Sequence, residues 1–124
     1  MPGQQSSGYS RELLMFYANH DIKTGEACDS AIKEYETRKD IYGADLLAWT
    51  CLMAGRLDEA RLAMRDALRL GTKDAQLFYH AGMIEKELGN QNEARRLLKL
   101  SLKTNPAFDL LQAEKARNIL ATMQ

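Results

Sequence analysis

Two segments of the chain repeat the same pattern 34 positions apart. Residues 54–60 read AGRLDEA, and residues 88–94 read LGNQNEA. The same offset pairs small residues with small ones and large apolar residues with large ones: Ala48 with Gly82, Gly55 with Gly89, Ala60 with Ala94, and Met64 with Leu98. A period of this length indicates that one supersecondary unit occurs twice, so the sequence contains two repeats, 41–74 and 75–108.

Each repeat predicts a pair of helices joined by a short turn. Residues 42–54 and 76–88 carry apolar residues at helical spacing, and a glycine follows each segment at the position of a left-handed C-cap. Asp-Glu and Asn-Glu pairs come shortly after these glycines, where acidic and capping side chains favour the first turn of a second helix. We expect the second helices to end near Leu70 and Lys103.

A degenerate first repeat precedes these two. Residues 25–27 read GEA and match the DEA of residues 58–60 at nearly the same offset. The first repeat then spans about 8–40, with helices over 10–20 and 26–39. Residues 1–8 are expected to form a flexible lead-in, because they contain no apolar periodicity.

A further helix is predicted after the last repeat. Asn105 is a good N-cap and Pro106 a good first residue, so this helix should cover about 106–122. Its expected packed side consists of Phe108, Leu111, Lys115 and Ile119, with Leu110, Ala113 and Leu120 beside them. The predicted fold is an all-α solenoid of about three helix-turn-helix repeats with a C-terminal capping helix, forming one domain over 9–122 with one core.

The two clear repeats resemble the tetratricopeptide repeat. The third repeat carries the residues of that pattern at Phe78, Ala81, Gly82, Gly89, Ala94, Leu98, Ser101 and Pro106. The second carries Ala44, Leu47, Ala48, Gly55, Ala60, Met64, Ala67 and Thr72, so its aromatic residue and its proline are missing. The resemblance covers about residues 8–108 and implies a short protein, or a fragment, that binds other proteins on the concave side of a helical stack.

The resemblance also implies which side chains face that concave side. They are Phe16, Tyr42, Asp45, Trp49, Met53, Tyr79 and Met83. A groove with aromatic and methionine residues suits an apolar or amphipathic helix, or an extended peptide with bulky anchors, and Glu12 and Asp45 would favour a basic flank on that ligand. The alternative is that Trp49 and Met83 are covered core residues, which an aromatic or methionine stripe at helical spacing equally predicts.

Two rows of basic residues suggest a second surface. Arg61, Arg65 and Arg69 lie at a spacing of four, and Arg95, Lys99 and Lys103 repeat the row 34 positions later. Such rows could bind an anionic partner, although a solvated outer face explains them more simply. Nucleic acid is not expected as a ligand, because basic and acidic residues both number 17 and no aromatic residues interleave with the rows.

No enzyme motif, cofactor site or metal site is predicted. The two histidines, His20 and His80, are far apart, and neither a nucleophile motif nor a glycine-rich phosphate loop is present. Cys28 and Cys51 lack the spacing of metal ligands, and they lie in apolar periodic segments. We therefore expect unpaired cysteines, no zinc and a reducing, cytoplasmic setting.

The remaining expectations concern membranes and self-association. No apolar run approaches the ~18 residues that a membrane span requires, so no membrane interaction is expected. A short array of repeats with an open end could form a homodimer, or could continue into further repeats of a longer protein. Self-association is therefore the alternative to partner binding.

Overall fold

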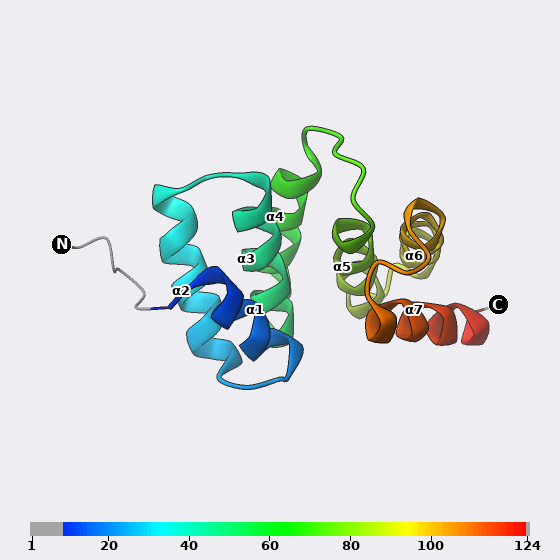
Figure 1. Cartoon of the computed structure of the whole chain (residues 1–124), viewed down its shortest axis with the longest axis horizontal. Helices are drawn as coiled ribbons and strands as arrows, with labels where there is room; N and C mark the ends of the chain where they lie inside the picture. Colours follow the sequence, from blue (N-terminus) through cyan, green and yellow to red (C-terminus); the bar gives the residue numbers. More distant parts are fainter. Residues whose placement is uncertain (1–8, 124) are drawn as a thin grey trace. The chain divides into compact units, whose positions relative to one another are not determined.

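The regular elements of the described residues are all helices. The computed structural model describes residues 9–123, and the expected lead-in 1–8 lies outside them. The helices, drawn in Figure 1, are α1 (Arg11–Asn19), α2 (Thr24–Thr37), α3 (Ile41–Met53), α4 (Leu57–Leu68), α5 (Ala75–Glu87), α6 (Gln91–Thr104) and α7 (Leu110–Thr122). The all-α prediction is confirmed, and the predicted ends of the first six helices agree with the structure within about two residues.

Packing divides the chain into two compact units. The first unit is Met1–Arg69 and contains α1 to α4, and the second is Leu70–Gln124 and contains α5 to α7. The sequence predicts one core, whereas the structure gives each unit its own. The junction explains the difference, because Leu70 is exposed and Gly71 adopts a left-handed φ of 72°, so this segment contributes no buried apolar side chain.

Helix α3 forms the centre of the first unit. Its residues from Gly43 to Leu52 are buried on every side, and α1, α2 and α4 all pack against it. A helix that is apolar all round belongs in a core. The one buried hydroxyl in its middle, that of Thr50, donates to the backbone carbonyl of Leu46 at 2.9 Å.

The second unit is built on the close pairing of α5 and α6. A Cβ atom added at Gly82 would lie 2.9 Å from both Cγ and Cδ2 of Leu98, so only glycine allows the two helices to approach this closely. Beside this contact, the buried hydroxyl of Ser101 donates to the carbonyl of Ala75 at 2.7 Å. Gly82 is thus the small residue at the crossing of α5 and α6.

The ends of the helices follow the sequence signals at most positions. Gly55 and Gly89 have φ values of 80° and 87°, which confirms the two predicted left-handed C-caps. Helices α3 and α5 begin after Asp40 and Asp74, whose carboxylates accept hydrogen bonds from backbone N–H groups of the first turn. These caps fix where α3 and α5 start.

The start of α7 differs from the prediction. The side chain of Asn105 accepts from the N–H of Ala107 in a turn, and the helix begins only at Leu110, where Asp109 accepts from the N–H of Gln112. Asp109 thus replaces Asn105 as the N-cap, and the predicted start at residue 106 is wrong.

The packed side of α7 differs as well. Its buried residues are Ala113 and Ala116, three positions apart on one face. Leu111 lies about 200° around the helix from Ala113, and it is 80% exposed, as is its neighbour Leu110 at 79%. The predicted row through Leu111 is therefore not the packed side.

Candidate functional site

Helix α1 presents one polar and aromatic face to solvent. Ser10 caps the helix by accepting from the N–H of Leu13 at 3.1 Å, and Leu14 and Ala18 are its buried residues. The opposite side carries exposed residues that we call the α1 face: Glu12, Phe16, Asn19 and His20. Two of these four, Phe16 and Glu12, were expected beside a partner-binding groove from the resemblance to the tetratricopeptide repeat.

Phe16 is the main apolar group of the α1 face. Its side chain is 49% exposed, and its ring lies 4.3 Å from the ring of His20 and 6.3 Å from that of Tyr17, between centroids. The ring of Tyr17 in turn has the ammonium of Lys23 5.7 Å from its centroid. Contacts with neighbouring rings restrict the rotamers of Phe16, so an aromatic anchor is held in place while half of it remains accessible.

Trp49 lies in the core of the first unit instead of on an open surface. It is only 5% exposed, and its indole N–H donates to the amide oxygen of Asn19 at 2.8 Å. Asp45, one turn earlier on α3, is buried to the same degree. The structure therefore favours the covered-core alternative for Trp49, and it covers Asp45 as well, because a ligand could touch neither without displacing residues around it.

The other residues of the expected groove are divided between the two units. In the first unit Tyr42 is exposed and Met53 half-buried, and in the second Met83 is half-buried. Tyr79 is 1% exposed, with its ring 5.7 Å from that of Phe108, and burial together with the charge of Asp109 raises the pKa of its phenol to about 12. Tyr79 thus acts as a core residue of the second unit.

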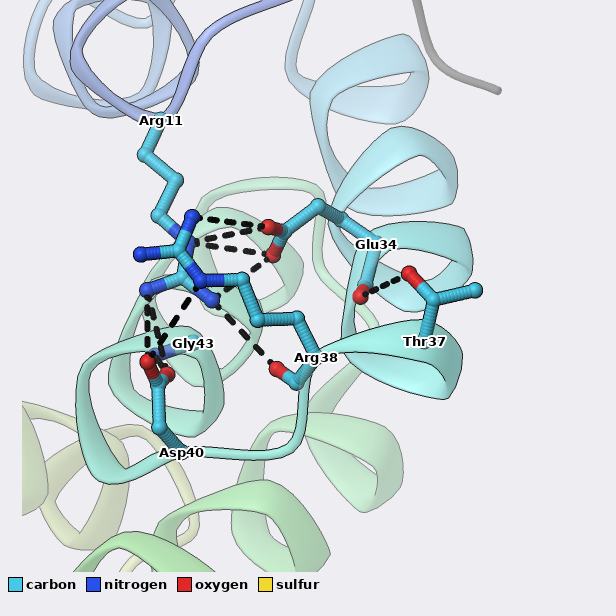
Figure 2. Close-up of polar contacts among 6 residues, drawn as sticks. All are labelled: Arg11, Glu34, Thr37, Arg38, Asp40 and Gly43. Carbon is cyan, nitrogen blue, oxygen red and sulfur yellow. Dashed lines mark hydrogen bonds and ion pairs between the residues drawn. The ribbon is translucent and has the colours of Figure 1, made fainter. Parts of the chain in front are cut away.

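A network of charged groups holds α1 in position. Figure 2 shows Arg11 of α1 facing carboxylates from two other places in the first unit. Its guanidinium pairs with Glu34 of α2 at 3.0 Å and with Asp40, the cap of α3, at 3.0 Å. It also donates to the backbone carbonyl of Arg38 at 3.3 Å. One side chain therefore links three helices.

Gly43 is the residue that makes room for this network. A Cβ atom at this position would lie 2.7 Å from a guanidinium nitrogen of Arg11 and 2.9 Å from Oδ1 of Asp40. The absence of a side chain also lets the Gly43 N–H donate to that oxygen at 2.7 Å. Sequence reasoning missed the network, because Arg11 is separated from Glu34 and Asp40 by 23 and 29 positions and no local pattern connects them.

The network makes the stability of the first unit depend on pH. Burial raises the pKa of Asp40, but the hydrogen bond from Gly43 and the charges of Arg11 and Arg38 lower it more, so the net shift is downward. A carboxylate with a lowered folded-state pKa stabilises the fold above its unfolded pKa, and this contribution is lost as the pH falls through the folded value.

We expect Asp40→Asn to be less stable than the wild type at about pH 6, with the difference shrinking below about pH 4. Asparagine keeps an oxygen that can accept from Gly43, so the comparison isolates the charge. Urea unfolding of both proteins across this range measures the effect. A difference that stays constant down to about pH 2 would contradict the assignment.

The basic rows lie on α4 and α6, one in each unit. Arg65, Arg69, Lys99 and Lys103 are exposed, whereas Arg61 and Arg95 are half-buried. Arg95 donates to the side chain of Asn92 at 2.9 Å. Each row is thus a largely solvated strip of its own helix, as the simpler alternative predicts.

The cysteines contradict the prediction that they are unpaired. Cys28 of α2 and Cys51 of α3 form a disulfide, with a Cα–Cα distance of 4.7 Å and both residues fully buried. The two cysteines are 23 residues apart, and no local sequence pattern connects them. They meet because α2 packs against α3. Closing a loop of this length stabilises a fold by about 3 kcal/mol in the chain-entropy model.

The disulfide also bears on the predicted cytoplasmic setting. That prediction rested on unpaired cysteines, whereas disulfides persist in oxidising compartments, so the cysteines no longer support it.

Side chains that bind metals do not cluster in the part of the chain that the structure describes. Within residues 9–123, no group of three or more His, Cys, Asp and Glu side chains could hold a metal ion. His80 is fully buried in α5. None of the described helices has both the length and the apolarity needed to cross a membrane.

Comparison of the whole chain with protein-family models and with curated proteins finds no match.

Proposed function

We propose that the chain is a helical repeat module of the tetratricopeptide type that binds a segment of a partner protein through the α1 face. The observation that carries the proposal is the half-exposed Phe16 ring, held against His20 on a helix that Arg11 fixes in place. Aromatic residues that are both rigid and accessible are typical anchors of protein interfaces.

The chemistry of the α1 face indicates the kind of segment that would bind. Phe16 offers an apolar contact, Asn19 an amide, and Glu12 an exposed carboxylate one turn before the ring. An amphipathic segment with one apolar anchor and a nearby basic residue would match these groups.

Two features support the repeat architecture itself. Glycines at equivalent positions of the two clear repeats, Gly55 and Gly89, adopt the same left-handed conformation. The alanines that follow them at the start of the second helices, Ala60 and Ala94, are both fully buried. The repeated sequence pattern thus corresponds to a repeated local structure.

The proposal is tested by substituting Phe16 and comparing what the protein captures. The wild type, Phe16→Ala and Leu62→Ala are immobilised and exposed to an extract of the source cells, and bound proteins are quantified by mass spectrometry. Leu62 is the matched control, because it is an exposed apolar residue of the same unit on a different helix. We expect Phe16→Ala to capture at least about 10-fold less of one specific partner protein than the wild type does. Truncating an interface anchor costs roughly 2 kcal/mol or more of binding free energy.

The control variant should retain that partner at the wild-type level. Both substitutions lie at exposed positions, so their melting temperatures should stay close to that of the wild type. Equal capture by Phe16→Ala and the wild type would refute the proposed site.

A further inference from the structure

Helix α2 packs against the first unit mainly through small side chains, with the larger Ile32 and Tyr35 only half-buried. Its buried residues are Ala27, Cys28 and Ala31, all of them small. The neighbouring α3 buries Leu46, Leu47 and Trp49. Because the stabilisation from burial scales with apolar area, α2 gains much less from packing than the helix it covers.

The ends of α2 add little stability. Its N-cap residue, Lys23, has a left-handed φ of 49°, and no side chain caps the helix in the described structure. Its last turn carries no basic residue to offset the helix dipole. Helix α2 therefore depends on other links to remain in place.

Four of those links are polar, the longest being the hydrogen bond that the Tyr9 hydroxyl donates to Glu26 at 3.4 Å. Glu34 pairs with Arg11 at 3.0 Å, and Asp29 pairs with Arg56 at 2.6 Å. The hydroxyl of Tyr35 donates to a carboxylate oxygen of Asp66 at 2.9 Å. The contacts Asp29–Arg56 and Tyr35–Asp66 lie at the surface and contribute little, because water and salt screen them. The Arg11–Glu34 pair, with side chains 19% and 20% exposed, is less screened, but it joins α2 to α1 and not to α3.

The remaining link is covalent. The disulfide joins Cys28, in the middle of the weakly packed face of α2, to Cys51 near the end of α3. Both cysteines are fully buried, so no reductant can reach the sulfur atoms while α2 is packed. Reduction must follow an opening of α2.

We propose that the Cys28–Cys51 disulfide controls the attachment of α2. With the bond intact, α2 stays packed on α3. When the bond is reduced, α2 detaches locally, while α3 and α4 remain paired through their larger apolar residues, which include Leu46 and Met64. The attachment is thereby sensitive to the thiol redox state around the protein, independently of the partner-binding role proposed above.

The reductive step balances with a dithiol as the reductant. One of its thiolates attacks a cysteine sulfur, the Sγ–Sγ bond breaks, and a mixed disulfide forms. The second thiol of the reductant then displaces the bound cysteine and closes the reductant into its own disulfide. Cys28 and Cys51 become thiols, taking up the two protons and two electrons that the dithiol gives up.

The experiment is hydrogen–deuterium exchange on the full chain, with and without dithiothreitol. The oxidised protein is first shown by mass, after alkylation in denaturant, to contain no free thiol. We expect α2 amides to exchange on the order of 100-fold faster after reduction. This factor corresponds to the free energy by which closing the Cys28–Cys51 loop stabilises the packed state. Amides in the middle of α3, and those of α5 in the second unit, should change by no more than about 3-fold.

A double variant, Cys28→Ala with Cys51→Ala, separates the lost bond from other effects of the reductant. It should show the fast α2 exchange without dithiothreitol, and no further change when the reductant is added. Three results would overturn the proposal: two free thiols in the protein before reduction, α2 exchange that reduction leaves unchanged, or equal loss of protection in α2, α3 and α4.

Discussion

Replacing Gly82 with alanine is expected to destabilise the second unit by roughly 1–3 kcal/mol. The added Cβ would lie 2.9 Å from Cγ and Cδ2 of Leu98 and 3.3 Å from the Leu98 backbone nitrogen. Leu98 is fully buried and cannot turn into free space. The helices α5 and α6 would therefore have to move apart, which separates the other buried pairs between them. Thermal or urea unfolding followed by circular dichroism measures the loss.

A second substitution identifies Leu98 as the cause. Leu98→Ala alone should cost roughly 2–5 kcal/mol through the cavity it leaves. In the double variant the new methyl group at position 82 meets no leucine, so the combined cost should fall below the sum of the two single costs by about 1 kcal/mol or more. Simple additivity would contradict the assigned contact.

Gly25→Ala is the matched control for this pair. Gly25 also lies in a helix, α2, but a Cβ at that position would have nothing within 4 Å. Alanine favours helix over glycine by up to about 1 kcal/mol. We therefore expect Gly25→Ala to be as stable as the wild type or slightly more stable.

Trp49→Ala is expected to destabilise the first unit by roughly 3–5 kcal/mol, the usual cost of removing a large aromatic side chain from a core. Trp49 is nearly fully buried, and its indole N–H is hydrogen-bonded to Asn19. Urea unfolding followed by circular dichroism measures this, since the variant lacks the only tryptophan of the chain. The half-exposed Phe16 provides the contrast, because Phe16→Ala should cost at most about 1 kcal/mol. Wild-type stability of Trp49→Ala would show that the side chain does not belong to the core.

Local rules explain why the sequence predicts most of the helices correctly. The left-handed glycines at 55 and 89 stop a helix whatever surrounds them, because other residues strain that backbone conformation. The small residue at Gly82 is also visible in the sequence, since the repeat places it opposite Ala48. Where two local signals compete, as Asn105 and Asp109 do before α7, the sequence does not show which one caps the helix.

The candidate site was harder to predict, because exposure depends on which helices cover a face. The resemblance implies that Phe16 and Trp49 both face the concave side, yet the structure exposes the first and buries the second. Trp49 is buried because α1, α2 and α4 all pack around α3. Contacts between separate helices cannot be predicted from the local pattern of one helix. The disulfide was missed for the same reason, since Cys28 and Cys51 meet only through the packing of α2 on α3.

The proposed function requires that a partner protein contact Phe16 on the surface and not Trp49 in the core. The direct test is a calorimetric titration of the captured partner into the wild type, Phe16→Ala and Trp49→Phe. Trp49→Phe keeps an aromatic ring in the core but removes the N–H that binds Asn19. We predict that Phe16→Ala weakens the affinity at least about 10-fold, whereas Trp49→Phe lowers stability but changes the affinity by no more than about 3-fold. A large loss of affinity in a folded Trp49→Phe protein, with wild-type affinity in Phe16→Ala, would contradict the claim.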